Sequence, residues 1–227
     1  MTSLDTTEAP VARTGLGELA GRHRRGVQLF GGIPYAAAPV GDRRFAPPAP
    51  PEPWEGVRDA RRFSPAAPQL PGEGMTDRLP VRWDEDCLYL NVVTPACDDA
   101  RRPVYLWIHG GAYQHGQGAL PWYDGTSFAT RGDIVVVTIN YRLGALGFCD
   151  LGSHLGDGFA SSGVNGTLDQ IAALRWVRDH IAEFGGDPDR VTIGGESAGA
   201  FSVSNLLVSP LADGLFHRAI AQSGATH

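Results

Sequence analysis

The segment from Val191 to Leu207 joins a strand pattern to a helix pattern through one serine enclosed by glycines. The β-branched run 191–193 predicts a strand, and the apolar residues after Ser197 recur at roughly helical spacing. Gly195 and Gly199 stand two residues before and two residues after Ser197. A strand and a helix that meet at so tight a turn leave little room for side chains at these two positions, and they strain the residue between them. The segment therefore predicts a strand, a tight turn with Ser197 at its apex, and a helix.

The pattern Gly-x-Ser-x-Gly is typical of a nucleophile elbow, in which the serine hydroxyl projects above the sheet and the next amide faces the same space. We therefore predict that Ser197 is a nucleophile and that the Ala198 amide binds a developing oxyanion. An ordinary glycine turn would account for the same five residues. A Gly-x-Gly-x-x-Gly phosphate loop would need glycine where Glu196 stands, and a Walker lysine is excluded because the chain contains no lysine.

Apolar runs before the elbow alternate with helical patterns. Strands are predicted over 88–93, 104–108, 134–139 and 191–193, with a last short strand over 219–222. A helix is predicted over 168–184, with a capping box formed by Thr167 and Gln170 and a stop at Gly185. Short antiparallel strands turning at glycines are expected near the N-terminus. Strands that alternate with helices predict an α/β fold with a mostly parallel sheet covered by helices.

Composition and charge exclude several classes of function. The 227 residues carry a net charge of -6 with acids scattered among arginines, which gives no basic surface for nucleic acid and argues against anionic membranes. Residues 1–14 lack the apolar core of a secretion signal and are expected to be disordered, so a cytoplasmic location is the default prediction. Cys87, Cys97 and Cys149 have no metal-ligand spacing and are expected to be reduced thiols. We expect no metal and no cofactor.

A glycine-rich loop, residues 109–118, follows the predicted strand that ends at Ile108. Small residues there allow the backbone itself to approach a substrate, and a tetrahedral oxyanion needs amide donors of this kind. Gly111 and Ala112 are therefore the predicted further oxyanion donors, beside Ala198. His109 is expected to brace the loop and not to accept protons.

A family resemblance rests on several motifs in order along the chain. These are "FGGIPYAAAPVGDRRFAPP", "EDCLYLNV", "WIHGGAY", "VVTINYRLGALGF", the elbow segment and "LFHRAIAQSGA". They resemble landmarks of the type-B carboxylesterases, the family of the cholinesterases and bacterial para-nitrobenzyl esterases. The resemblance covers the chain from about Gly26 onward. It implies an α/β-hydrolase fold and hydrolysis of carboxylic esters through an acyl-enzyme on Ser197, with Glu196 as the acidic neighbour of the nucleophile.

The resemblance also implies two buried ion pairs, Arg44 with Glu85 and Arg142 with Asp169. One family feature is missing: in secreted relatives the cysteine of "EDC" is bridged to an earlier cysteine, whereas no cysteine precedes Cys87 here. Alanines occupy the corresponding region at 66 and 67. That disulfide cannot form in this chain, and the cholinesterases' cation-binding tryptophan is not carried over to Trp83.

In this fold the triad acid and histidine follow the serine along the chain. The thirty residues after Ser197 hold one acid, Asp213, and the histidines His217 and His227, none of which is expected to be the triad partner. The earlier histidines, at 23, 115, 154 and 180, are weaker candidates. Residues 1–227 are therefore interpreted as the N-terminal part of a single α/β-hydrolase domain that is incomplete at its C-terminus. The expected partners are a small-molecule ester and the missing C-terminal half, without which the chain is expected to be nearly inactive and to aggregate.

Two other hypotheses remain open at this point. A non-catalytic binding protein of the same fold, like the adhesion relatives of cholinesterases, usually lacks the serine, and here Ser197, Gly111 and Ala112 are all present. A peptidase or lipase of the same fold is the second, because the shape of a substrate pocket cannot be read from sequence.

Overall fold

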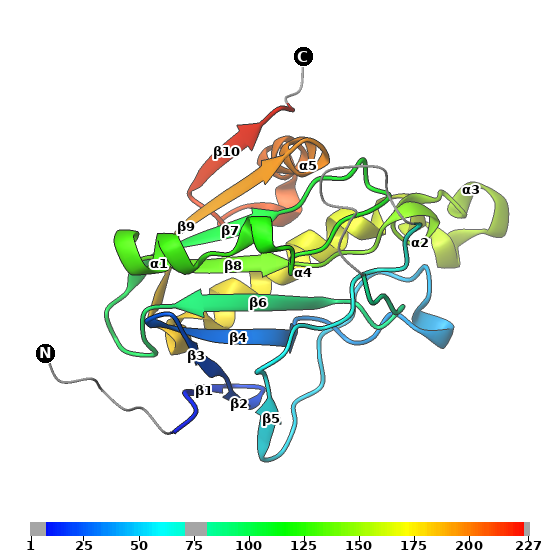
Figure 1. The fold of residues 1–227 in the computed structure, drawn as a ribbon. Coiled ribbons are helices and arrows are strands. Elements are labelled where there is room, and N and C mark those ends of the chain that lie inside the picture. Colours follow the sequence, from blue (N-terminus) through cyan, green and yellow to red (C-terminus); the bar gives the residue numbers. More distant parts are fainter. Residues whose placement is uncertain (1–7, 71–80, 225–227) are drawn as a thin grey trace, which may run out of the picture.

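The structure is a computed structural model that describes residues 8–70 and 81–224. Its elements are drawn in Figure 1. The strands are β1 Val11–Thr14, β2 Gly17–Ala20, β3 Arg22–Arg24, β4 Val27–Pro34, β5 Val57–Asp59, β6 Tyr89–Thr94, β7 Arg102–Ile108, β8 Val135–Ile139, β9 Gly186–Glu196 and β10 Arg218–Gln222. The α-helices are α1 Thr126–Gly132, α2 Gly144–Phe148, α3 Gly152–Leu155, α4 Asn165–His180 and α5 Ala198–Leu207. Short 3-10 turns link several of them, including Ile181–Phe184 after α4.

The main sheet has seven strands in the order β10-β9-β7-β8-β6-β4-β3. The pairings β10/β9, β9/β7 and β7/β8 are parallel, and the pairings β8/β6, β6/β4 and β4/β3 are antiparallel. The sheet is thus mixed, and the expected parallel arrangement holds only for its C-terminal half. In the antiparallel half only β3 and β4 form a hairpin, whereas β4, β6 and β8 pair across long connections.

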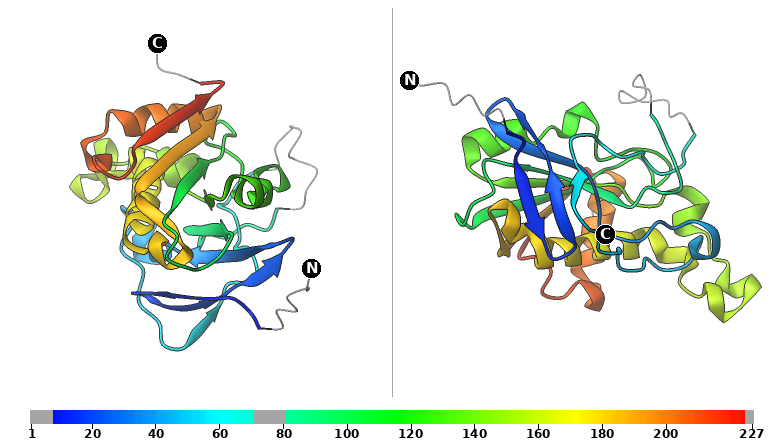
Figure 2. Two further views of the ribbon diagram at one scale, coloured as in Figure 1. Left: turned by 90° about the vertical axis from the view of Figure 1, so that its left-hand side faces the viewer. Right: turned by 90° about the horizontal axis from the view of Figure 1, so that it is seen from below.

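The two faces of the sheet are covered differently. Figure 2, left, shows α4 and α5 on one face and the short α1 on the other. In β7 the buried residues Val104, Leu106 and Ile108 alternate with the half-buried Tyr105 and Trp107. The first set lies in the large core beneath α4 and α5, as the period of two in a strand requires. The second set leaves an aromatic surface on the face of α1.

A separate three-stranded sheet, β1-β2-β5, packs at the N-terminal side. Its β1/β2 hairpin confirms the expected antiparallel strands. The expectation that residues 1–14 are disordered is wrong for Val11–Thr14, which form β1 with the apolar side chain of Ala12 buried. Residues 1–7 lie outside the described part of the chain.

The predicted helix is present, but it begins earlier than expected. Helix α4 starts at Asn165 with Val164 as its N-cap, so Thr167 lies inside the helix and the Thr167–Gln170 capping box is wrong. The side-chain amide of Asn165, in the first turn, donates to the Phe45 carbonyl at 2.7 Å and accepts from the Ser161 hydroxyl at 3.0 Å. The α-helix also ends earlier than expected, at His180. The chain continues as the 3-10 turn Ile181–Phe184, which Gly185 ends in a left-handed conformation with φ of 74°.

Both implied ion pairs form. Arg142 and Asp169 are 2% and 0% exposed and lie 2.7 Å apart. Arg44 and Glu85 approach to 2.6 Å, but their side chains are 47% and 31% exposed, so the description of this pair as buried is wrong.

The three cysteines are free thiols. Cys87 lies in the core, and burial raises its pKa well above the ordinary value. None of the helices in residues 8–70 and 81–224 is long and apolar enough to span a bilayer.

Candidate active site

Ser197 occupies the single residue between β9 and α5. Its backbone has φ of 53° and ψ of −121°, a combination that costs a residue with a side chain about 1–3 kcal/mol. Glycines make this turn possible. A Cβ atom at Gly199 would lie 2.1 Å from the Ile108 carbonyl oxygen, and one at Gly195 would lie 2.4 Å from the Gly199 carbonyl. The strand-turn-helix predicted from the sequence is therefore present, with the serine in a strained position at its apex.

The glycine-rich loop after β7 lies directly against this serine. A Cβ atom at Gly110 would lie 2.6 Å from the Glu196 carbonyl oxygen and 3.2 Å from the Ser197 Cβ atom. The next three residues, Gly111, Ala112 and Tyr113, all have positive φ, of 108°, 53° and 59°. Positive φ is uncommon for residues with a side chain, so Ala112 and Tyr113 place backbone strain in this part of the loop, next to Ser197. Within the described residues, the amides of Gly111, Ala112 and Ala198 have no hydrogen-bond acceptor.

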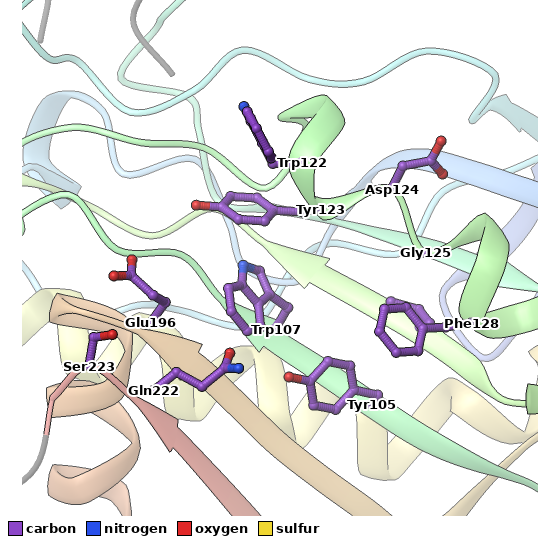
Figure 3. Close-up of a pocket in the computed structure, with 11 residues that line it drawn as sticks. Tyr105, Trp107, Trp122, Tyr123, Asp124, Gly125, Phe128, Glu196, Gln222 and Ser223 are labelled. Carbon is purple, nitrogen blue, oxygen red and sulfur yellow. The ribbon is translucent and has the colours of Figure 1, made fainter. Parts of the chain in front are cut away.

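Glu196 ends β9 and faces the aromatic side of the sheet. It lines a cavity of about 460 Å³ together with Tyr105, Trp107, Trp122 and Tyr123. In Figure 3 the Tyr123 hydroxyl and the Glu196 carboxylate lie at the same end of this cavity. Burial raises the pKa of Tyr123, and the negative charge of Glu196 raises it further. The Glu196 carboxyl group therefore lies on the aromatic side of the sheet, in the residue next to the serine.

Comparisons with known proteins show which family the chain belongs to. The family model described as "Carboxylesterase family" matches residues 8–227. The chain belongs to the carboxylesterase family. It is 48% identical over 218 residues to the para-nitrobenzyl esterase of Bacillus subtilis (strain 168), covering 95% of this chain and 44% of that protein. It is 47% identical over 231 residues to the pyrethroid hydrolase Ces2e of Rattus norvegicus, covering 95% of this chain and 40% of that protein.

Solved structures agree with the sequence relatives. The Geobacillus stearothermophilus carboxylesterase EST55 matches with a TM-score of 0.87 and 54% identity over 92% of this chain and 43% of that one. A thermophilic para-nitrobenzyl esterase matches with a TM-score of 0.90 and 46% identity over 96% and 45%. The carboxylesterase chain thus has the α/β-hydrolase fold of these enzymes. It spans less than half the length of the relatives it matches.

His109 of this carboxylesterase chain is a fixed, uncharged part of the glycine-rich loop. It is 1% exposed, its ring stacks on Tyr141 at 4.5 Å, and its Nδ1–H donates to the Gly110 carbonyl at 2.8 Å. Burial lowers the pKa of His109 from 6.5 to about 4. The ring therefore stays neutral at pH 7, in line with the bracing role expected from the sequence.

This lowered pKa predicts a loss of stability in acid. In the unfolded chain His109 takes up a proton below about pH 6.5, whereas in the folded chain it takes up this proton only near pH 4. The free energy of unfolding therefore falls as the pH decreases from 6.5 to about 4. The full loss amounts to about 3 kcal/mol, at about 1.4 kcal/mol for each pKa unit. Urea unfolding at pH 7.5 and pH 4.5 should show a smaller acid loss in His109→Gln than in the parent protein. His23→Gln, at an exposed position of β3, is the matched control. Equal acid losses in His109→Gln and in the parent would contradict the prediction.

The described residues offer no partner for the Ser197 hydroxyl, which makes no hydrogen bond with them. The ring of His217 accepts from the Val191 amide at 3.2 Å. Val191 lies about 20 Å from Ser197 along β9, at about 3.3 Å per residue, so His217 does not reach the serine. Asp213 directly follows the 3-10 turn Pro210–Ala212, beyond α5. His227 lies outside the described residues.

Three residues that the sequence analysis did not single out hold the glycine-rich loop. Gln69 pairs with the backbone of Gly116, the Asn140 side chain accepts from the Gly118 amide at 2.8 Å, and the Tyr141 hydroxyl donates to the His109 carbonyl at 2.8 Å. Each acts through hydrogen bonds between distant segments, which leave no periodic signal in a sequence. In residues 8–70 and 81–224 there is no cluster of three or more potential ligands for a metal ion.

Proposed function

We propose that the chain supplies the nucleophile and oxyanion hole of a serine carboxylesterase. Ser197 gives its proton to a general base, attacks the carbonyl carbon of a carboxylic ester and forms an acyl-enzyme, while the alcohol leaves with that proton. Water then hydrolyses the acyl-enzyme, which releases the acid and restores the serine hydroxyl. The amides of Gly111, Ala112 and Ala198 bind the oxyanion of each tetrahedral intermediate. Helix α5, ten residues long, begins at Ala198 and adds the positive end of its dipole. Neither a metal nor a cofactor is part of this proposal.

One observation carries the proposal. The strained Ser197 and the glycine-rich loop come from different parts of the chain, yet they touch through Gly110, where even a methyl group would not fit. A stable fold has no need to hold a serine in a costly conformation beside amides that have no described acceptor. A site for acyl transfer needs both, because it must expose a hydroxyl and stabilise an oxyanion at adjacent positions.

The general base and its acid are proposed to belong to a C-terminal half that this chain does not contain. Two features of the described residues support such a partner. Every residue of β10 is exposed, and β10 pairs with β9 alone among the described strands. The 3-10 turn Pro121–Tyr123 and helix α1, on the aromatic side of the sheet, also carry side chains that remain largely exposed, Trp122 at 67% and Phe128 at 59%. An unpaired edge and an uncovered aromatic face fit a surface on which more of the same domain packs. The cytoplasmic location remains a prediction.

The intact mass of the polypeptide produced from the native gene tests this proposal first. A mass well above 24.2 kDa, together with hydrolysis of p-nitrophenyl esters by that product, would support it. Residues 1–227 expressed alone should hydrolyse these esters at least about 10⁴-fold more slowly, because loss of the base removes most of the catalysis.

The opposite results would count against the proposal. A 24.2 kDa product without esterase activity would favour the non-catalytic binding protein of the same fold. Rapid labelling of Ser197 by a fluorophosphonate in residues 1–227 alone would show that this part already contains a base.

A further inference from the structure

Gln69 is one of the three side chains that hold the glycine-rich loop, and it bonds to both backbone polar groups of Gly116. Its Nε2 group donates to the Gly116 carbonyl at 2.9 Å, and its Oε1 atom accepts from the Gly116 amide at 2.9 Å. The same Nε2 group also donates to the Ala67 carbonyl at 3.0 Å. Gln69 thus satisfies both polar groups of one residue in the loop, which fixes the orientation of the backbone there as well as its position.

Gly116 transmits this constraint to the start of the loop. Its φ is 115°, and a Cβ atom there would lie 2.4 Å from His109 Nδ1 and 2.7 Å from the Gly110 carbonyl oxygen. Gly116 therefore packs directly on the two residues that precede the predicted oxyanion donors. Gly110 in turn packs against Glu196 and Ser197. A continuous series of contacts connects Gln69 to the nucleophile.

The segment that carries Gln69 is itself held firmly. The Ala66 amide donates to the Arg82 carbonyl at 2.9 Å, and the Asp84 amide donates to the Ala66 carbonyl at 3.0 Å. Both Ala66 and Ala67 are buried. Gln69 therefore extends from a fixed backbone and is only half-buried itself, so it can orient the loop without being part of the main core.

We propose that Gln69 is a positioning residue for the oxyanion hole: it holds Gly116 on His109 and Gly110 and so sets where the amides of Gly111 and Ala112 point. This inference rests on the proposed function, because those amides matter only if an oxyanion forms beside Ser197. Donors of this kind stabilise charge only when they are fixed before the reaction, and a displacement of about 1 Å can reduce the rate by about 10²-fold.

The test compares two substitutions in the full polypeptide from the native gene. Gln69→Met has similar length but no hydrogen-bonding group. Gln28→Met is the matched control, because Gln28 also accepts from a backbone amide, that of Cys97 at 3.1 Å, in a part-buried position of β4. We expect kcat for p-nitrophenyl esters to fall by about 10–100-fold in Gln69→Met, with KM within about threefold of the parent. Gln28→Met should keep the parent kcat.

A trifluoromethyl ketone, which forms a tetrahedral adduct with a serine hydroxyl, separates positioning from general damage. Its Ki should rise in Gln69→Met by the same factor by which kcat/KM falls, since both report binding of an oxyanion. Gln69→Glu keeps the acceptor for the Gly116 amide but loses both donated bonds, so it should also lower kcat, and it serves as the second variant if Gln69→Met does not fold.

A parent-like kcat in either Gln69 variant would overturn the inference, as would a rate loss that Gln28→Met reproduces. A Ki for the ketone that stays constant while kcat falls would also overturn it. These outcomes leave the proposed function standing. A parent polypeptide without ester hydrolysis would instead remove the proposed function, and this inference with it.

Discussion

Ser197→Ala should abolish ester hydrolysis by the full polypeptide, with kcat lower by about 10⁵–10⁶-fold. In a serine hydrolase, removal of the nucleophile leaves only the contribution of the oxyanion hole and of substrate binding. The strained turn that holds Ser197 is set by Gly195 and Gly199 and does not depend on the hydroxyl, so the fold should survive the substitution. Steady-state hydrolysis of p-nitrophenyl acetate measures the loss.

The matched control for this experiment is Ser204→Ala. Ser204 lies in α5, the helix that begins directly after Ser197, is buried, and belongs to no part of the proposed site. Its variant should hydrolyse esters at the parent rate. A fluorophosphonate should add its mass to the parent and to Ser204→Ala but not to Ser197→Ala. Hydrolysis or labelling that persists in Ser197→Ala would show that the nucleophile is another residue.

The parts of the fold that could be predicted are those with local causes. Strand β8 is a run of β-branched residues buried on both faces, and the elbow needs glycines at fixed positions around Ser197. Each of these leaves a short pattern that a reader of the sequence can recognise. The boundaries of β7 and β8 accordingly agree with the prediction to within two residues.

The parts that were mispredicted or missed depend on contacts between distant segments. Helix α4 begins at Asn165, whose side chain donates to the carbonyl of Phe45, 120 residues earlier, and a local capping pattern carries no signal of such a contact. The role of Gln69 likewise depends on Gly116, 47 residues away. The general base that we propose for Ser197 left no pattern of either kind, because His109 and His217 bond to other residues, the Gly110 carbonyl and the Val191 amide.

Asp169→Leu should destabilise the folded protein by about 3–5 kcal/mol, because it leaves the guanidinium of Arg142 buried without its counter-charge. The carboxylate of Asp169 accepts three hydrogen bonds from Arg142, two from the side chain at 2.7 and 2.8 Å and one from the amide at 3.0 Å. Arg142 also donates to the Ala46 carbonyl at 2.6 Å. The pair thus joins α4 to the loop after β8 and to a proline-rich segment. Urea unfolding of the full polypeptide measures the effect.

The double variant Arg142→Met/Asp169→Leu decides whether the pair supplies stability or only fixes the arrangement. The attraction between two buried charges offsets most of the free energy needed to remove them from water. Replacing both partners with apolar groups should therefore lower the free energy of unfolding less than Asp169→Leu alone. The exposed pair of Arg178 and Asp179 gives the comparison, because Arg178→Met should cost well under about 1 kcal/mol. A cost for Asp169→Leu no larger than that for Arg178→Met would contradict the prediction.

The same double variant also tests the position of the glycine-rich loop. Arg142 directly follows Tyr141, whose hydroxyl donates to the His109 carbonyl. A double variant that remains folded but loses esterase activity would show that this pair fixes the position of the loop.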